Sequence, residues 1–423
     1  MSMLIIADDL SGAADCAIGF ACAGYRTVVT LDAAQPFPAD VIAADIDTRR
    51  LAPAQAGERA AAVWQTFRQP GRRLYKKIDS TLRGNWAAEV AALQPLAGLA
   101  IVAPAFPATG RTVLGGQLFV HGNPLVTTDT WQLEHANRCA DPRAMLAEAG
   151  LTTALVDLPT LREGSDALAA RIARIAADGT QTLIVDAETA GDLLTLARAT
   201  APLNDRLFWV GSGGLARELA SMPGLFDGSA RADAARPAPR AAHGAPVLVM
   251  VGSLSAVAER QCAVLREQGN VRELIVPPAV LRLCERHTDW PVWQTRIAAA
   301  LGARVDLLLR IGRDDAFDPV EGALLSAALA ALAQPHFAAL GGLVVTGGET
   351  ARAMLGAIGI GNLELVAEIE AGVALGQPLG AGAPAHLRVV TKAGAFGTDH
   401  ALYAAWRYLH EPPGGGAVSR QSA

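Results

Sequence analysis

Residues 3–12 read MLIIADDLSG, an apolar run that ends in two aspartates, a polar turn and a glycine. The run Met3–Ala7 has the length and composition of a buried β-strand. A helix is expected at Ala13–Ala23, followed by a second strand at Arg26–Leu31. Strand, helix and strand in this order predict a parallel βαβ unit, and therefore a protein of the α/β class.

Acidic and basic side chains follow the first strands of this predicted sheet. Asp8 and Asp9 end the first strand, and Arg49 comes shortly after the strand expected at Val41–Ile46. Ligands of open α/β sheets bind beyond the carboxyl ends of the strands. We expect one aspartate, with Asp9 favoured, to face a ligand and the other to cap the helix near Gly12. Arg49 would hold a carboxylate at the same edge, the alternative being a solvated arginine beside a helix start.

A dense polar motif occupies residues 76–85, KKIDSTLRGN, between a short strand and a helix that starts near Trp86. Ser80 or Thr81 would cap that helix, and its free N–H groups favour an anion. Cations, an acid and hydroxyls at such a turn suit a small ligand that carries several hydroxyls and a carboxylate or phosphate. The alternative is an ordinary surface loop with a capped helix.

The composition excludes several other classes of protein. The 423 residues correspond to two or three domains at about 150 residues each, and the net charge of −5 contains no long block of one sign. We therefore expect no nucleic-acid surface and no membrane span. The five cysteines are scattered and form no CxxC pair, which predicts reduced thiols in a cytoplasmic protein rather than a disulfide frame or zinc site. The N-terminus lacks the basic region of a signal peptide.

The rest of the first half continues the alternation of strands and helices. Residues 104–122, rich in proline and glycine, are expected to form a shaped loop without regular structure, and neither Arg111 nor His121 in it is chosen as a site residue. Further strands are expected at Ala100–Ala103, Ala154–Asp157, Thr182–Asp186 and Leu207–Val210.

Gly211–Ala216 fits the dinucleotide pattern G-x-G-x-x-A after a strand. The following strand and acid of a nicotinamide site are missing, so a dehydrogenase remains only an alternative. Residues 226–246, rich in Ala, Pro, Arg and Gly, predict a linker between a domain at 1–225 and a domain at 247–423.

In the second domain, glycine-bearing turns follow three expected strands. Ser253 lies in the turn after Val247–Val251, Gly347–Thr350 follows Leu343–Thr346, and residues 392–399 follow the last strand. Such turns at the carboxyl ends of strands can together hold nucleotide phosphates. None matches the P-loop, and the protein-kinase motifs are also absent.

Six blocks of the chain resemble, in order, the four-carbon acid sugar kinases, the family of D-threonate, D-erythronate and 3-oxo-tetronate kinases. The blocks are IADDLSGAAD, KKIDSTLRGN, PAFPATGRT, VGSLS, TGGET and TKAGAFG. The resemblance spans nearly the whole chain. It implies an N-terminal substrate domain and a C-terminal ATP domain, each a largely parallel sheet flanked by helices, with the active site in the cleft between them. It also implies phosphorylation of the terminal 4-hydroxyl.

The resemblance assigns substrate contacts to Asp9, Arg49, Asp79, Ser80, Thr81, Leu82 and Arg83, and ATP contacts to Ser253, Gly347, Gly348, Glu349, Thr350 and Gly397. We also expect Lys77 to contact the substrate, and Lys392 and Gly394 to contact ATP. Position 11 is Ser where many members have Thr, which keeps a hydroxyl.

The expected mechanism aligns a sugar acid, most simply D-threonate, with the γ-phosphate of ATP. Arg49 or Arg83 would pair with the substrate carboxylate, and Asp9 and Asp79, the expected catalytic residues, would accept hydrogen bonds from its hydroxyls. Mg²⁺ would assist without identified ligands, Glu349 and Asp399 being candidates. D-Erythronate and 3-oxo-tetronate are alternative substrates, a non-catalytic sugar-acid sensor is an alternative function, and a homodimer is a further expectation.

Overall fold

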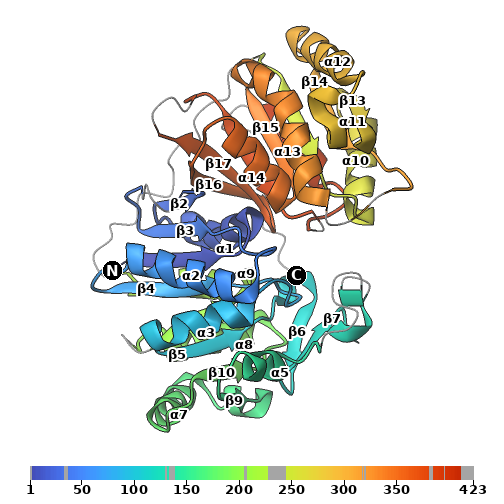
Figure 1. Cartoon of the computed structure of the whole chain (residues 1–423). Helices are drawn as coiled ribbons and strands as arrows, with labels where there is room; N and C mark the ends of the chain where they lie inside the picture. Colours follow the sequence, from blue (N-terminus) through green and yellow to red (C-terminus); the bar gives the residue numbers. More distant parts are fainter. Residues whose placement is uncertain are drawn as a thin grey trace. The chain divides into compact units, whose positions relative to one another are not determined.

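The computed structural model describes residues 2–32, 37–128, 131–132, 139–203, 207–226, 244–316, 318, 321–380, 384–394 and 396–410 (Figure 1). The chain divides into two compact units, Met1–Ala232 and Asp233–Ala423. Most of the predicted linker, residues 227–243, lies outside the described residues.

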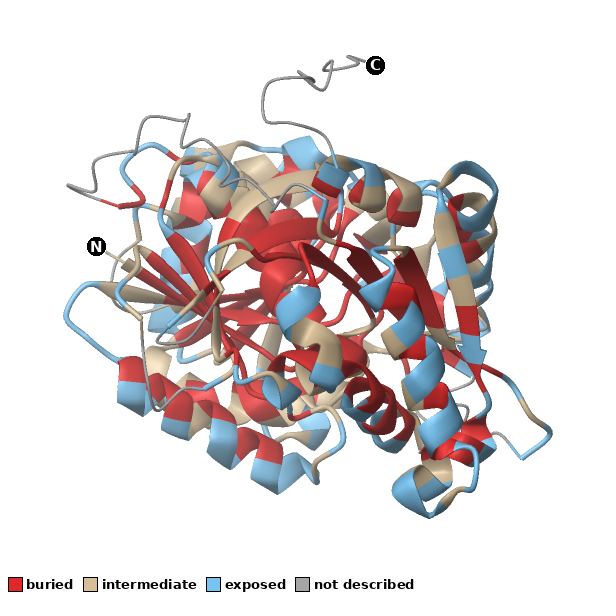
Figure 2. Cartoon of the chain, turned by 90° about the horizontal axis from the view of Figure 1, so that it is seen from above, coloured by how far each residue is buried: buried red, intermediate tan, exposed pale blue. Residues whose placement is uncertain are grey.

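The first unit is built on a parallel sheet that, in the part of the chain described, runs in the order β2-β3-β1-β4-β11-β5-β10-β9. Its strands are β1 (Ser2–Ala7), β2 (Thr27–Thr30), β3 (Val41–Asp45), β4 (Arg72–Lys77), β5 (Leu99–Ala103), β9 (Thr153–Val156), β10 (Thr182–Val185) and β11 (Leu207–Gly211). The buried runs expected from the sequence therefore form strands, because helices on both sheet faces cover them. Most residues of these strands are buried, and Figure 2 shows strands in the interior mainly in the colour of buried residues.

Two groups of helices flank this sheet. The helices α2 (Pro53–Phe67) and α3 (Trp86–Ala97) pack on each other, and α3 packs on α5 (Pro142–Glu148). The other group packs in series as α1 (Leu10–Cys22), α9 (Gly213–Ala220), α8 (Ala190–Thr200) and α7 (Ser165–Ala177), with the short α6 (Leu158–Leu161) beside α7 and α8. Because parallel crossovers are right-handed, α1 and α2, which lead in opposite directions along the sheet, cover opposite faces.

The stretch expected to be an irregular loop is instead a small antiparallel sheet, so that prediction was wrong. After a 3₁₀ turn at Pro107–Thr109, the strands β6 (Arg111–Leu114), β7 (Gln117–Val120) and β8 (Asn123–Pro124) pair in sequence order. Gly115 and Gly116 form the tight turn with φ of +60° and +76°, which glycine adopts without strain. A second short 3₁₀ turn follows at Leu125–Thr127.

The second unit has a mixed sheet, ordered β13-β14-β12-β15-β18-β17-β16 among the residues described. Its parallel strands are β12 (Val247–Val251), β13 (Val271–Val276), β14 (Asp306–Ile311), β15 (Gly342–Thr346) and β18 (Arg388–Lys392). Sequence reasoning missed the antiparallel pair β16 (Asn362–Glu370) and β17 (Val373–Leu379).

Helices also flank the second sheet on two sides. On one side α10 (Ala256–Gln268) packs on α15 (Ala401–His410), and on the other α13 (Gly322–Ala333) packs on α14 (Gly348–Ala357), α11 (Pro278–Leu283) and α12 (Trp290–Gly302). Short 3₁₀ turns lie at Cys284–Arg286 and Gln334–Ala339. By length and composition alone, Gly322–Ala339 could cross a membrane. In the fold, however, its Leu325, Leu329 and Leu332 are buried side chains of the second unit.

The two units open with the same connections. In the first, β1 lies between β3 and β4, and β2 lies beyond β3. In the second, β12 lies between β14 and β15, and β13 lies beyond β14. Each central strand leads to a helix on one face, while its two neighbours lead to helices on the other. Each central strand is therefore flanked by crevices of the kind in which α/β proteins bind ligands.

Candidate functional site

Three loops of the first unit meet at the carboxyl edge of the sheet. Ala7, the last residue of β1, is in register with Asp45 of β3 and Lys77 of β4. The residues that follow these strands therefore leave the sheet at one level. This register brings Asp9, Arg49 and the 76–85 motif together, as the sequence predicted.

Arg49 is the centre of this cluster. Its Nε donates to Asp8 Oδ2 at 2.9 Å, Nη1 lies 3.1 Å from Asp9 Oδ2, and Nη2 lies 3.7 Å from Asp79 Oδ2. Burial opposes the guanidinium charge, but Asp8, Asp9 and Asp79 raise the pKa of Arg49 well above its usual value. Burial would raise the pKa of Asp8, but Arg49 and the lysines of β4 lower it overall. Sequence reasoning left Asp8 out of the site, because adjacent acids cannot be told apart without the backbone.

Asp9 serves two of these contacts at once. Its Oδ1 accepts from the N–H of Gly12 at 2.7 Å and caps α1, while its Oδ2 faces Arg49. Asp9 therefore has the capping role that was expected of one of the two aspartates, and its contact with a ligand stays a prediction. A Cβ on Gly12 would lie 2.5 Å from Asp9 Oδ1 and 2.8 Å from Lys77 Nζ, so only glycine lets the helix start approach these groups.

Asp79 organises the turn after β4. Its Oδ1 accepts from the N–H of Thr81 at 2.8 Å and from the Thr81 hydroxyl, and its Oδ2 accepts from Arg83 Nη2 at 2.7 Å. Burial would raise the pKa of Asp79, but Arg83 and Arg49 hold it well below its usual value. Asp79 is therefore an ionised acceptor at neutral pH.

The expectation that Ser80 or Thr81 caps the next helix was wrong. Helix α3 begins at Trp86 with Asn85 at the cap position, and the Asn85 side chain donates to Thr48 O and Leu51 O at 2.9 and 2.8 Å. The turn needs left-handed backbone at Leu82, with φ of +58°, and at Gly84. The side chains of Ser80, Thr81 and Leu82 are buried. A ligand contact from Leu82 would therefore use its backbone.

The cluster contains positive and negative side chains that act on one another. Burial opposes the charge of Lys77, but Asp9, Asp8, Asp15 and Asp79 raise its pKa. Arg111, at the start of β6, lies within electrostatic reach of Asp79 and Arg83, and burial lowers its pKa. Lys77, Arg49, Arg83 and Arg111 thus lie among Asp8, Asp9, Asp15 and Asp79, so charges of both signs are mixed throughout the cluster. Sequence reasoning noted Arg111 but did not choose it.

A buried ion pair joins the two elements on either side of the turn at residues 78–85. Lys76 Nζ lies 2.7 Å from Glu89 Oε2, and neither side chain is exposed. The Thr48 hydroxyl donates to the other oxygen of Glu89. The pair links β4, α3 and the loop that carries Arg49, so it has a positioning role.

The glycines that suggested a nicotinamide site are explained by close packing. A Cβ on Gly211 would lie 2.7 Å from Ala103 O, and one on Gly214 would lie 2.6 Å from Ala105 O. Ser212 caps α9 by accepting from the N–H of Gly214. Within the described part of the first unit, no strand follows α9 to complete the fingerprint.

In the second unit, the turn after β15 opens a helix of suitable geometry for phosphate. Gly347, with φ of +96°, precedes α14, whose first turn holds Gly348, Glu349 and Thr350. The Thr350 hydroxyl lies 3.0 Å from Ser326 Oγ. A Cβ on Gly252 would lie 1.9 Å from Thr350 Oγ1, so the turns after β12 and β15 are in direct contact. The free N–H groups of such a helix start favour an anion.

The turn after β18 packs against the turn after β12. Ser255 Oγ donates to Gly394 O at 3.3 Å, and a Cβ on Gly394 would lie 2.6 Å from Ser253 Oγ. Lys392 Nζ donates to the carbonyls of Ala393, Gly394 and Phe396, at 2.9, 3.3 and 2.9 Å. Burial lowers the pKa of Lys392 to about 8. Lys392 thus shapes the loop that carries Gly394 and, beyond it, the exposed Gly397.

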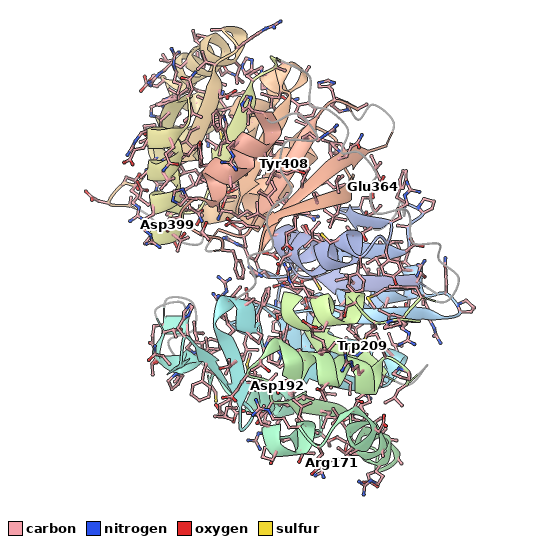
Figure 3. All side chains as sticks on the ribbon, turned by 180° about the vertical axis from the view of Figure 1, so that it is seen from behind. Arg171, Asp192, Trp209, Glu364, Asp399 and Tyr408 are labelled. Carbon is pink, nitrogen blue, oxygen red and sulfur yellow. The ribbon has the colours of Figure 1, made fainter. Side chains whose placement is uncertain are left out.

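The two acids considered for Mg²⁺ differ in their surroundings. Glu349 is half-buried at the start of α14, whereas Asp399 forms an exposed ion pair with Arg260 at 2.9 Å. Figure 3 labels Asp399 in this unit. In the part of the chain that is described, no group of three or more His, Cys, Asp or Glu side chains could hold a metal. Of the two acids, Glu349 is the one in the first turn of α14, and its contact with Mg²⁺ stays a prediction.

The fold and these two sets of loops define a two-unit α/β protein with a charged cluster at a sheet edge in one unit and glycine turns before helices in the other. Residues 3–219 match the model of a sugar-binding N-terminal domain, and residues 248–402 match that of a nucleotide-binding C-terminal domain. The chain belongs to the family in which these two domains are joined, the family of the four-carbon acid sugar kinases.

Several relatives are similar over nearly their whole length. A D-threonate kinase of Cupriavidus necator is 56% identical over 97% of this chain and 99% of its own. A D-threonate kinase of Bordetella bronchiseptica is 34% identical over 96% and 97%. A solved structure from Salmonella typhimurium, at 24% sequence identity, has a TM-score of 0.77 and covers 96% of this chain and 99% of its own, which confirms the fold.

Proposed function

We propose that this protein is an ATP-dependent kinase that transfers a phosphoryl group to the 4-hydroxyl of D-threonate. The observation that carries the proposal is the combination of the charged cluster around Arg49 with a near-full-length similarity to a D-threonate kinase at 56% identity. Kinases of D-erythronate and 3-oxo-tetronate are more distant, at 29% and 32% identity, and these acids are the alternative substrates.

The first unit binds the sugar acid. Arg83 receives the substrate carboxylate together with Arg111, because Arg49 is already bound to three carboxylates of the protein. Asp9 and Asp79 accept hydrogen bonds from the substrate hydroxyls, and Lys77 contributes positive charge beside them. Ser80, Thr81 and Leu82 shape this turn. Arg49 acts mainly by holding the acidic side chains in place.

The second unit binds ATP. Its phosphates lie at the helix start formed by Gly347–Thr350, with Ser253 and the loop of Lys392, Gly394 and Gly397 beside them. The Mg²⁺ that accompanies ATP would neutralise phosphate charge, with Glu349 as its protein contact. Alignment of the 4-hydroxyl with the γ-phosphoryl group supplies most of the rate, which requires the sugar acid on a substrate domain at 1–225 and ATP on an ATP domain at 247–423 to be bound at the same time. A cytoplasmic location and a homodimer accompany this proposal.

The decisive experiment is ADP release from a panel of D- and L-threonate, D- and L-erythronate and 3-oxo-tetronate. We expect D-threonate to give the highest kcat/KM and a product phosphorylated at O4. A higher value for another acid of the panel would move the assignment to that acid. Stabilisation by NAD but not by ATP with Mg²⁺, without ADP release from any acid, would overturn the kinase assignment.

A further inference from the structure

Asp186 is a buried carboxylate that has no part in the function proposed above. It follows β10 at the carboxyl edge of the first sheet, and only 1% of its surface is exposed. Its two oxygens accept from successive backbone N–H groups, Oδ2 from Gly115 at 2.7 Å and Oδ1 from Gly116 at 2.8 Å. Gly115 and Gly116 form the turn of the hairpin β6–β7 (Figure 1), so Asp186 holds the tip of that hairpin.

The residue after Asp186 fixes the same hairpin further along β6. Val113 donates its N–H to Ala187 O at 2.9 Å, and Ala187 donates its N–H to Val113 O at 3.0 Å. The hairpin is therefore attached to the end of β10 by two hydrogen bonds through the Asp186 carboxylate and two through Ala187. The exposed side chain of Arg143, on α5, also donates to Gly115 O at 3.0 Å.

The other end of β6 brings Arg111 to the charged cluster. Phe106, in the loop after β5, donates its N–H to Arg111 O at 2.8 Å and accepts from the N–H of Arg111 at 3.1 Å. The Arg111 guanidinium lies within electrostatic reach of Asp79 and Arg83. In the sheet, β11 and β5 lie between β4, which leads to Asp79, and β10, which leads to Asp186. The strand β6 therefore connects the end of β10 with the turn after β4.

The contact between Asp186 and the hairpin requires a carboxylate. Two N–H donors on successive residues each need an acceptor, and an ionised carboxylate supplies both, whereas an amide supplies one oxygen and a competing donor. Burial raises the pKa of Asp186, although the N–H groups of Gly116 and Gly115 oppose this shift. A buried acid costs desolvation free energy that an apolar residue would not cost. What the chain gains in return is a hairpin held in one position.

We propose that Asp186 is a positioning residue of the sugar-acid site, which holds the hairpin β6–β7 so that Arg111 stays beside Arg83. The inference rests on the proposed function, in which these two arginines receive the substrate carboxylate, and it adds the residue that keeps Arg111 in place. Asp186 itself does not touch the substrate. Its loss should therefore weaken binding of the sugar acid and leave phosphoryl transfer unchanged.

The test is a double-mutant cycle of Asp186→Asn with Arg111→Ala in the full-length protein. Steady-state ADP release and calorimetric titration are measured with each acid of the panel named above. Asp186→Asn should raise the KM for the best acid at least about tenfold and leave kcat and the KM for ATP within about twofold, because only ground-state binding of the carboxylate is lost. In the Arg111→Ala background the same change should alter the KM by less than about twofold, because the arginine that Asp186 positions is already gone.

Hydrogen exchange of backbone amides reports on the hairpin without depending on catalysis. Asp186→Asn should speed exchange in residues 111–120 and leave exchange in β1 unchanged. The control is Asp157→Asn, because Asp157 follows the neighbouring strand β9 and accepts from Thr160 N at 3.1 Å to cap α6. It should alter neither the KM for the acid nor the exchange of the hairpin. Asp186→Ser, which keeps one acceptor in a smaller side chain, replaces Asp186→Asn with the same expected results if that variant does not fold.

Three results overturn the inference. Unchanged exchange in the hairpin would show that Asp186 does not hold it, and faster exchange with an unchanged KM for the acid would make Asp186 a purely structural residue. Effects of Asp186→Asn and Arg111→Ala that multiply in the double variant would show that Asp186 does not act through Arg111. Failure of the proposed function is recognised separately. If wild type releases no ADP with any acid but calorimetry shows the same non-additive loss of acid affinity, the kinase assignment fails and the role of Asp186 stands; if no acid binds or reacts, both fail.

Discussion

Replacing Asp79 by Asn tests the centre of the substrate site with a change of almost no volume. The amide oxygen can still accept from Thr81, so the turn keeps its local hydrogen bond. The amide NH₂ would face Arg83, 2.7 Å from the present Oδ2, and Arg49, 3.7 Å from it. The guanidinium groups of both arginines then face an N–H donor where they had an acceptor, and neither has the negative charge of the Asp79 carboxylate beside it.

The size of the effect follows from these contacts. A hydrogen bond to a charged group contributes about 1.5–3 kcal/mol, so we expect the free energy of unfolding to fall by roughly that amount. The larger loss is in catalysis, because the arginines change position and an acceptor for the substrate hydroxyls disappears. We expect kcat/KM for D-threonate to fall at least ~100-fold, equivalent to about 2.7 kcal/mol, with the KM for ATP unchanged.

The assay is steady-state ADP release together with urea unfolding. The matched control is Asp192→Asn, because Asp192 is also a buried carboxylate paired with an arginine, Arg162 at 2.9 Å (Figure 3). It lies in the first turn of α8, after β10, and not in the loops after β1, β3 and β4 that carry the Arg49 cluster. The control should lose stability and keep kcat/KM. Near-normal turnover by Asp79→Asn would refute the assigned role of this carboxylate.

The pH dependence of this comparison is fixed by the pKa of Asp79, which is held well below its usual value. A carboxyl whose pKa is depressed by folding contributes stability that is fully present above the unfolded value, near 3.9, and is lost as the pH falls through the folded value. Between about pH 5 and 8 the difference in stability between wild type and Asp79→Asn arising from this group should therefore stay constant.

Arg83→Ala should raise the KM for the sugar acid by an amount equivalent to about 2–4 kcal/mol and leave the KM for ATP unchanged. Arg49→Ala, which leaves three carboxylates without their arginine, should also destabilise the first unit. Equal effects on the KM of both substrates would show that the arginine in question is not part of the sugar-acid site. Lys392 has a folded pKa of about 8, below its usual 10.5. The unfolded state therefore binds more protons between these two pH values, and the free energy of unfolding should rise with pH in that range. If urea unfolding gives the same pH dependence for Lys392→Met as for wild type, the prediction is wrong. A fragment starting at His243 should fold and bind ADP with no first unit present, and a folded fragment without ADP affinity would show that first-unit groups are needed.

Much of the fold was readable because it rests on buried apolar runs. The runs at Met3–Ala7 and Val247–Val251 are apolar enough that only a strand covered on both faces accommodates them. The β16 strand was missed although Asn362–Glu370 alternates apolar and acidic residues, because its partner Val373–Leu379 contains Gly and Pro and breaks the pattern. The hairpin at Gly115–Gly116 also carried a usable signal, a Gly-Gly pair between apolar runs.

The candidate site was predictable in its members and not in its contacts. Position at the ends of strands brought Asp9, Arg49 and Asp79 into one cluster. The partner of each charge depends on backbone angles that residue types do not specify, such as the left-handed Leu82 that directs Arg83 back to Asp79. Arg111 depends on the small sheet that was not foreseen.

Because the two units share a strand order, recognition of the sugar acid and binding of the nucleotide can change separately in such an enzyme. The connections of β1–β4 and of β12–β15 are alike, while the loops after β1, β3 and β4 carry aspartates and arginines and the turns after β12 and β15 carry glycines. Specificity for a new sugar acid can then arise by drift in the loops after β1, β3 and β4, with the donor nucleotide left unchanged. Relatives named as kinases of three different acids fit a history in which the sugar-binding half of the gene changed its substrate and the nucleotide-binding half kept its nucleotide.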